Sequence, residues 1–520
     1  MRRLRPLLLD AAVFAAGLAL VHQPLERMDS PTPDARYYAS HAASLAAGEG
    51  LWMRIGEARF PPLNPIGLPI LLAPAYWLPG DGLGRGLLFI QLSAAALLVL
   101  VRRTAHALAG PLAGAIAPLL LLLSPEFTSA SHWILTEIPF TLLLTLSLVL
   151  LLRPTSPLRA GAAGVVAGVA GWMRPVGFLL ALAALPLLWR RPAPFRRVLA
   201  FGAGAALLIP PLLWAQSVLY GGPFRSGYAF YGSFFVDYPG TGFSWRYALF
   251  GRGWTAVSSN VGHLFHYLDD LVGGAHTLLP LPAAALAVYG FARHRRFGLA
   301  AAAATALLLT LQSFYYFVQT RYLVPLLPLL AIGAAAGVAV LARRHRWLAL
   351  ALLAVGFAFQ GGKAWTWLRN RTPPALQAQS LSAAAAAMEP DAALATALDP
   401  LLVHHYVLRG TGRTSLPLLD VLLFTYPRPI PGPLPPTPPG ASIMERYEAF
   451  VAWAEPRGAR KFYVAGVARW LDALEREVLP RQPVYLEAAS RPLAPDAWRA
   501  LEQRFRLVPV AENVWRLTAR

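Results

Sequence analysis

The sequence contains no cysteine, and its only lysines are Lys363 and Lys461. Without cysteine, the chain can form neither a disulfide framework nor a thiolate metal site. It also lacks the GxxxxGKS/T, GxSxG and HExxH patterns, so it shows no machinery for nucleotide-driven transport or for the common soluble hydrolase reactions. Charged residues make up 14% of the chain. That share is far below the roughly 25% of an average soluble domain, so an ordinary soluble protein is excluded.

Hydrophobic residues dominate what is present. They make up 56% of the 520 residues, and the mean hydropathy is +0.47, as is typical of a polytopic membrane protein. The formal net charge is +20. The arginines nevertheless stand in short clusters between apolar stretches rather than on one basic face. We therefore interpret them as topology signals and expect no nucleic-acid partner.

Apolar stretches able to cross a hydrocarbon core of about 30 Å, alone or with flanking residues, recur about eleven times before residue 363. Their approximate ranges are 6–22, 86–101, 107–123, 136–152, 160–173, 176–189, 198–216, 276–292, 298–317, 322–341 and 347–362. The first has the basic start of a signal peptide, but no small-residue cleavage site follows it, so we expect a retained span. The sequence predicts a mainly α-helical membrane bundle over residues 1–362.

Arginines divide unequally between the two sides that these spans define. Clusters such as Arg102–Arg103 and Arg343–Arg344 fall in short loops on one side, whereas the short loops of the other side hold Arg174 and Arg321. The positive-inside rule predicts a cytoplasmic N-terminus and, with eleven spans, an extracytoplasmic tail. The preference for arginine over lysine fits a GC-rich bacterium, so we expect the inner membrane of a bacterial cell envelope.

Three longer segments are expected on the outer side: a first loop over 23–85, a second over 217–275 and a tail over 363–520. The second loop is rich in aromatic residues and glycine, which is typical of a segment at the membrane interface. The tail contains a Pro-rich linker over 426–440 and β-like runs such as KFYVAG, which begins at Lys461 and precedes the helical pattern WLDALEREVL. We expect the tail to form a small extracytoplasmic α/β domain.

The first outer loop carries Asp34 and Arg36 beside Tyr37 and Tyr38, and returns through the Pro-rich run FPPLNP. Polar residues kept at the membrane edge are costly, so they are functional candidates by default. A solvated loop start with Asp34 as a helix cap would explain the same residues without any function. The Pro-rich return favours a functional loop.

The run SHWILTEIPF places His132 and Glu137 at the start of the fourth span. Glu137 could serve only as an acid in a first helical turn, where negative charge is favoured by about 0.3–1 kcal/mol. It begins an otherwise uncharged span and lies on the side of the membrane that is also predicted for Asp34, which favours a functional role. His132 by itself is equally consistent with a hydrogen-bonded ring at the interface.

Arg174 in GWMRPVG and Arg321 in QTRYLVP stand on the side where the positive-inside rule disfavours arginine. Each could be a snorkelling side chain at the end of a span. A guanidinium that topology does not favour is, however, well suited to bind an anion, and it can bind phosphate in bidentate fashion. The two arginines, with Tyr322 beside the second, predict a phosphate site at the outer face.

His263 and His266 in GHLFHYLDD have the i, i+3 spacing that can place two imidazoles on one helical face as metal ligands. An amphipathic interfacial helix explains the same segment, and we favour it. The sequence identifies no metal ligand set, although a divalent metal stays open as a cofactor.

The order and sidedness of DARYY, FPPLNP, TEIPF, MRPVG and RYLVPLLP resemble those of the C-type glycosyltransferases (GT-C). These polytopic enzymes use polyprenyl-phosphate-linked sugars and include protein mannosyltransferases and the aminoarabinose transferase of lipid A. The resemblance covers residues 1–362 and implies a GT-C fold whose active-site cavity opens to the membrane for a lipid donor and to the exterior for an acceptor. The pair Asp34-Ala35 has one carboxylate where the family has two, which argues against a metal role for this motif.

By position, the resemblance implies that Asp34 is the general base of a transfer reaction. It implies that Arg174 and Arg321 stabilise a leaving phosphate, and that Glu137 orients sugar hydroxyls or holds a metal. Further substrate contacts are expected from Arg36, Tyr37, Tyr38, His132 and Tyr322.

The expected function is transfer of a monosaccharide from a polyprenyl-phosphate donor to a lipid, glycan or protein acceptor outside the cytoplasm. The alternative is a membrane transporter or lipid flippase, which would need charges near the bilayer midplane and gating on both faces. The gathering of the candidate charges on one predicted face favours the enzyme.

Overall fold

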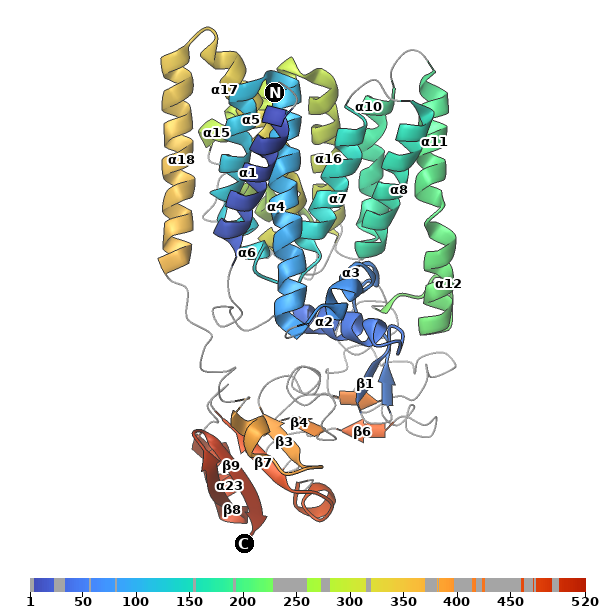
Figure 1. The fold of residues 1–520 in the computed structure, drawn as a ribbon, viewed down its shortest axis with the longest axis vertical. Helices are drawn as coiled ribbons and strands as arrows, with labels where there is room; N and C mark the ends of the chain where they lie inside the picture. The colour runs from blue at the N-terminus through green and yellow to red at the C-terminus, as the bar shows by residue number, and fades with distance from the viewer. Residues whose placement is uncertain are drawn as a thin grey trace.

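A computed structural model of the chain describes residues 4–22, 33–55, 58–79, 82–152, 156–189, 193–227, 260–272, 281–314, 319–369, 381, 383–396, 414–417, 423–425, 460–462, 471, 474–488 and 495–520. Most of these residues form a bundle of helices, and a small mixed sheet lies at one end of it (Figure 1). The fold is therefore mainly helical with a small C-terminal sheet, in agreement with the class expected from the sequence.

The first half of the bundle runs from α1 to α10 with two short 3-10 segments. Its elements are α1 (Leu4–Val21), α2 (Pro33–Ala46), α3 (Gly67–Leu72), η2 (Ala73–Trp77), α4 (Gly82–Ala109), α5 (Pro111–Leu122), α6 (Pro125–Ala130), α7 (Glu137–Leu150), α8 (Pro157–Met173), α9 (Val176–Leu180), η3 (Ala181–Ala184) and α10 (Leu185–Leu188). The second half comprises α11 (Pro194–Ala206), α12 (Ile209–Tyr220), α14 (Asn260–Val272), α15 (Leu281–Arg293), α16 (Arg295–Ser313), η5 (Thr320–Leu326), α17 (Leu327–Ala342) and α18 (Arg346–Arg369).

Within the described residues, each apolar stretch predicted from the sequence falls on helical structure. Four segments are long and apolar enough to cross a membrane by length and composition, namely Gly84–Ala109, Pro194–Tyr220, Arg295–Ser313 and Thr320–Ala342. The number of eleven crossings stays a prediction. The final helix of the bundle, α18, continues to Arg369, past the domain boundary expected at residue 362.

Small residues allow some helices to pack closely. A Cβ atom added at Gly164 of α8 would lie 2.0 Å from the carbonyl oxygen of Phe201 in α11, and one added at Gly204 would lie 2.2 Å from the oxygen of Gly161. Such close backbone approach is the usual packing of helices in lipid, where burial of apolar area adds little. This contact holds α11 against α8, although few residues of the span Pro194–Tyr220 are buried.

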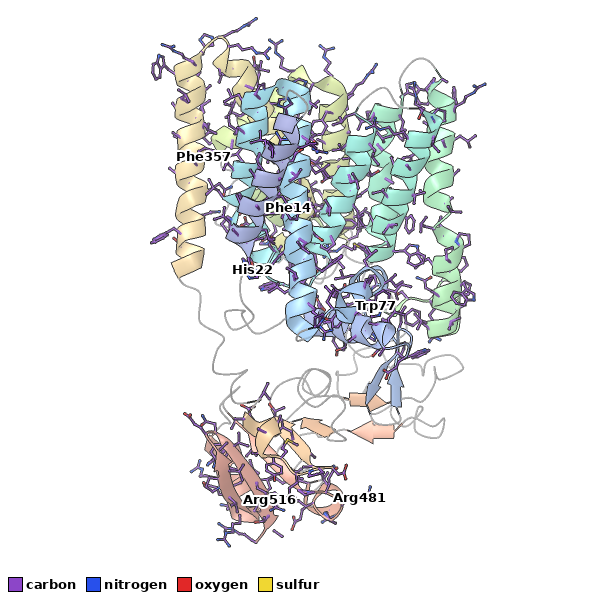
Figure 2. The ribbon with its side chains drawn as sticks, viewed as in Figure 1. Phe14, His22, Trp77, Phe357, Arg481 and Arg516 are labelled. Carbon is purple, nitrogen blue, oxygen red and sulfur yellow. The ribbon has the colours of Figure 1, made fainter. Side chains whose placement is uncertain are left out.

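The first loop covers one end of the bundle. Figure 1 shows α2 and α3 lying across the end that faces the C-terminal sheet, while the N-terminus lies at the opposite end. Trp77 lies beside α2 at this end (Figure 2) and donates a hydrogen bond from Nε1 to the carbonyl oxygen of Ala46 at 3.1 Å. A short antiparallel hairpin, β1 (Met53–Ile55) with β2 (Ala58–Phe60), extends from the same loop.

The C-terminal sheet has the strand order β4-β3-β7-β9-β8. Its strands are β3 (Ala393–Thr396), β4 (Thr414–Pro417), β7 (Val484–Glu487), β8 (Phe505–Ala511) and β9 (Val514–Ala519), beside α23 (Pro495–Arg504). β3 pairs in parallel with β4 and β7, whereas β9 pairs antiparallel with β7 and β8.

The strand predicted from Lys461 is present as β6 (Arg460–Phe462), which pairs with β5 (Leu423–Thr425). In the run expected to be helical, the structure describes a π-helical turn, η8 (Leu474–Val478). The Pro-rich linker over 426–440 lies outside the described residues.

Candidate active site

Four charged side chains from four elements meet where α2 crosses the bundle. Asp34 lies in the first turn of α2, and Glu137 is the first residue of α7. Arg174 ends α8 in an extended conformation, because Pro175 follows it and disfavours helix at that position. Arg321 lies in the first turn of η5. We call these four residues the charged quartet.

Ion pairs link each member of the charged quartet to the next one in space. Arg174 donates from Nη2 to Glu137 Oε1 at 2.5 Å and from Nε to Thr136 Oγ1 at 2.7 Å. Arg321 Nη2 lies 3.1 Å from Asp34 Oδ2, and its Nε lies 3.6 Å from Glu137 Oε1. Arg321 therefore stands between the two carboxylates, and the formal charges of the four side chains sum to zero.

Burial differs sharply within the charged quartet. The Glu137 side chain is 1% exposed, whereas that of Asp34 is 37% exposed. Glu137 Oε2 is buried and has no hydrogen-bond partner among the described residues. A buried carboxylate oxygen normally accepts hydrogen bonds, so this atom is suited to a donor that a ligand would bring.

Aromatic rings surround the two guanidinium groups. The ring of Tyr322 lies 5.5 Å from Arg174 Cζ and 5.4 Å from Arg321 Cζ, and the ring of Phe140 lies 5.8 Å from Arg174 Cζ. These distances are within the range of cation–π attraction. Burial, with the nearby charge of Asp34, raises the pKa of the Tyr38 hydroxyl well above its ordinary value, so this hydroxyl stays protonated.

The structure thus brings together Asp34, Tyr38, Glu137, Arg174, Arg321 and Tyr322. Tyr37 is half-buried on α2, and His132 is buried in the turn before α7. The side chain of Arg36 lies outside the described residues, as does that of His263. His266 lies on α14, where its Nε2 is 3.5 Å from Asp270 Oδ2.

Asn64 contacts the charged quartet but was missed as a candidate, although it lies within the run FPPLNP. Its Nδ2 donates to Asp34 Oδ1 at 3.4 Å. The same run is held by Tyr220 at the end of α12, whose hydroxyl donates to the carbonyl oxygen of Pro62 at 2.8 Å. The Pro-rich return therefore places the side-chain amide of Asn64 beside the carboxylate of Asp34.

His41 was also missed, because nothing in its sequence context distinguishes it. It follows Asp34 by two helical turns on α2 and is 1% exposed. Its Nδ1 lies 2.8 Å from the carbonyl oxygen of Leu51, so Nδ1 carries the proton and donates. Burial lowers the pKa of His41 to about 4, and the ring is neutral at pH 7.

A metal set is not formed by these residues. Among the described residues, no three His, Asp or Glu side chains come together as a group able to hold a metal ion. Both carboxylates of the charged quartet are instead paired with guanidinium groups. The donor set does not fit a resident metal.

The similarity of this chain to known proteins is a similarity of fold. No protein-family model and no curated protein matches the chain. The chain is similar to the crystal structure of ArnT from Cupriavidus metallidurans bound to undecaprenyl phosphate, at 16% identity and a TM-score of 0.61, over 98% of this chain and 97% of that chain.

The apo state of the same protein gives 16% identity and a TM-score of 0.62, over 99% and 98% of the two chains. The oligosaccharyltransferase of Archaeoglobus fulgidus is more distant, with 12% identity and a TM-score of 0.45 over 78% and 62%. The apolar helices and the likeness to ArnT indicate a multi-pass membrane protein. The chain has an ArnT-like GT-C fold, as its motifs led us to expect.

Proposed function

We propose that this protein is a membrane glycosyltransferase that moves one monosaccharide from a polyprenyl-phosphate donor to an acceptor on the extracytoplasmic side. The observation that carries the proposal is the charged quartet, in which two carboxylates and two guanidinium groups meet at one end of an ArnT-like fold. The ArnT structure that contains undecaprenyl phosphate supports a donor of this class.

Asp34 is proposed as the general base. It is the more exposed carboxylate of the charged quartet, so an acceptor hydroxyl can reach it. As the acceptor oxygen attacks the anomeric carbon, its proton passes to Asp34, and the bond between that carbon and the phosphate oxygen breaks. The products are the glycosylated acceptor and the polyprenyl phosphate, which keeps the bonding electrons.

Arg321 and Arg174 are proposed to stabilise the charge of the phosphate as it leaves. Arg321 is proposed to contact the phosphate first, because it is held less tightly than Arg174. Its distances to the carboxylates of Asp34 and Glu137 are longer than the 2.5 Å contact of Arg174 with Glu137. A phosphate that binds Arg321 competes with Asp34 for the guanidinium group. Donor binding would thereby release the carboxylate that has to accept the proton.

Glu137 is proposed to orient the sugar. Its Oε2 atom is buried without a partner among the described residues and can accept a hydrogen bond from a sugar hydroxyl. Protonated Tyr38 and the rings around the arginines supply donors and apolar faces for the same ligand. Arg36, Tyr37 and His132 complete the proposed set of substrate contacts.

An apolar cavity of about 380 Å³ supports a lipid ligand. It lies between α15 and α16, and its lining includes Phe291, Leu309, Leu330 of α17 and Leu271 of α14. This volume is within the range of about 300–1,000 Å³ found for small-molecule sites. Apart from Thr305 the lining is apolar, so the cavity suits a hydrocarbon chain.

The proposed topology has a cytoplasmic N-terminus and an extracytoplasmic C-terminal domain, in a bacterial inner membrane. The first loop and the C-terminal sheet lie at the same end of the bundle, opposite the N-terminus, and this arrangement supports the proposal (Figure 1).

The test is transfer from a panel of radiolabelled polyprenyl-phosphate sugars by the purified protein, with Asp34→Asn as the main variant. The variant should bind donor while kcat falls about 10³-fold, which is within the usual contribution of a general base. Glu49→Gln, which removes a charge from the same loop, is the matched control and should transfer at the wild-type rate.

Two results would overturn the proposal. Asp34→Asn could turn over as fast as wild type, which would exclude it as the base. Alternatively, the folded wild-type protein could consume no donor in the panel and instead move a lipid across the membrane of liposomes. The protein would then be a transporter and not a glycosyltransferase.

A further inference from the structure

The chain that leads into η5 is held by the amphipathic helix α14. Thr320 Oγ1 donates a hydrogen bond to Asp270 Oδ2 at 2.7 Å. The backbone N–H of Gln319 donates to the hydroxyl of Tyr267 at 3.4 Å. Gln319 and Thr320 are the two residues that precede Arg321, so both contacts act directly before a member of the charged quartet.

These contacts matter because η5 has no cap of its own. Gln319 occupies the N-cap position with an extended backbone, and its side chain makes no capping hydrogen bond. Helix starts leave backbone N–H groups that need partners from outside the helix. Here α14 supplies one such partner and adds a carboxylate that binds the next side chain.

The carboxylate of Asp270 is well suited to hold a fixed geometry. The residue is 2% exposed, and Tyr267 is fully buried. Buried hydrogen bonds to a charged group are among the stronger ones in proteins, because a buried charge that loses its partner cannot be solvated by water instead. His266 Nε2 on the same helix lies 3.5 Å from Asp270 Oδ2, and Lys363 on α18 is within electrostatic reach of Asp270.

We infer that Asp270 and Thr320 are positioning residues, which fix the first turn of η5 so that Arg321 reaches Asp34 and Glu137. The inference rests on the proposed function for its catalytic meaning. Because Leu271 of α14 also lines the apolar cavity, the helix that holds Arg321 touches the space proposed for the lipid chain. Lipid in the cavity and the guanidinium group at the site would then be connected through one helix.

The experiment uses the full-length protein in detergent and undecaprenyl phosphate as the probe. Thr320→Val keeps the shape of the side chain and removes the donor, Thr320→Ser restores the hydroxyl, and Asp269→Asn is the matched control on an exposed neighbour of Asp270. We expect Thr320→Val to weaken probe binding about 10-fold and to lower kcat/KM for the donor about 10²-fold, the usual cost of a small misplacement. Thr320→Ser and Asp269→Asn should behave as wild type.

A double-mutant cycle with Arg321→Ala separates positioning from general packing. If Thr320 acts through Arg321, Thr320→Val should have no further effect on probe binding in the Arg321→Ala background. An equal loss in both backgrounds would overturn the inference, as would wild-type binding by Thr320→Val.

Hydrogen exchange over residues 319–326 gives a readout that does not depend on any ligand. Thr320→Val should speed exchange in this segment, and Asp269→Asn should not. If wild-type protein neither binds the probe nor transfers sugar, the proposed function fails. The positioning role is then decided by exchange alone, and unchanged exchange in Thr320→Val would refute it.

Discussion

Two clusters of arginine and carboxylate in this molecule differ in what they leave open. On α1, Asp10 is buried and both its oxygens are occupied, one by Arg102 and the other by Arg103 of α4. In the charged quartet, Asp34 is partly exposed and Glu137 has a buried oxygen without a partner among the described residues. The first cluster is satisfied by the protein itself, whereas the second has capacity for a ligand.

An ion pair can hold two helices together and leave no carboxylate oxygen for a ligand, as in the Asp10 cluster. Arg102 and Arg103 were interpreted from the sequence as topology signals, yet in the structure they bind α4 to α1. What distinguishes the charged quartet is its assembly from four elements, its partly exposed carboxylate Asp34 and the unsatisfied oxygen of Glu137.

The largest effect is expected from an apolar replacement within the charged quartet. Glu137→Leu combined with Arg174→Met removes a buried pair without leaving an unpaired charge, and such replacements are often neutral for stability. Transfer activity should nevertheless fall by about 10²–10³-fold, as when a stabilising donor is removed from an active site. Transfer assays and thermal unfolding in detergent would check both statements. Activity within tenfold of wild type would show that this pair is as structural as that of Asp10.

The next effect concerns stability alone. Asp10→Asn leaves Arg102 buried beside a neutral side chain, and the loss of one partner from a buried pair costs about 3 kcal/mol or more. Thermal unfolding should shift accordingly, while kcat per folded molecule stays at the wild-type value. The double variant Asp10→Leu with Arg102→Met is the control and should recover most of the loss. A fall in turnover without a fall in stability would give this cluster a functional role.

The smallest effect is a pH dependence of stability that comes from His41, which is buried on the same helix as the partly exposed Asp34. Because burial lowers the pKa of His41 to about 4, the unfolded chain takes up the proton first as the pH falls below about 6.5. Stability should therefore decrease on acidification, by about 1 kcal/mol between pH 7 and pH 5.5.

Unfolding of wild type and His41→Asn at both pH values would check this prediction. Asparagine can keep the hydrogen bond to Leu51 but does not titrate, so the variant should lose this part of the pH dependence. An equal slope in the two proteins would mean that His41 is not responsible.

All four members of the charged quartet were candidates from the sequence, three of them because they depart from a local rule. Arg174 and Arg321 contravene the positive-inside pattern, and Glu137 opens an uncharged helix. Helix positions followed from hydropathy, and the structure adds that the helix before Pro175 ends at Arg174 with an extended backbone. These signals are local, so a single chain is enough to read them.

Pairings across the bundle could not be predicted in this way. The contact of Arg321 with Asp34 joins residues 287 positions apart, and it depends on where the whole bundle places α2 and η5. Asn64 and His41 carry no pattern that marks them, since an amide in a loop and a histidine in a helix are common. The order of the C-terminal strands likewise depends on long-range pairing, which short β-like runs do not encode.

The order of the charged quartet along the chain gives its assembly a direction in time. Asp34 and Glu137 are synthesised first, Arg174 follows, and Arg321 comes last. A nascent chain therefore carries an excess of negative charge at this position until η5 has been inserted, and only then do the charges of the quartet cancel. Formation of the site is in this sense a late step of membrane insertion, and a product truncated before residue 321 would keep one carboxylate without a guanidinium group to balance it.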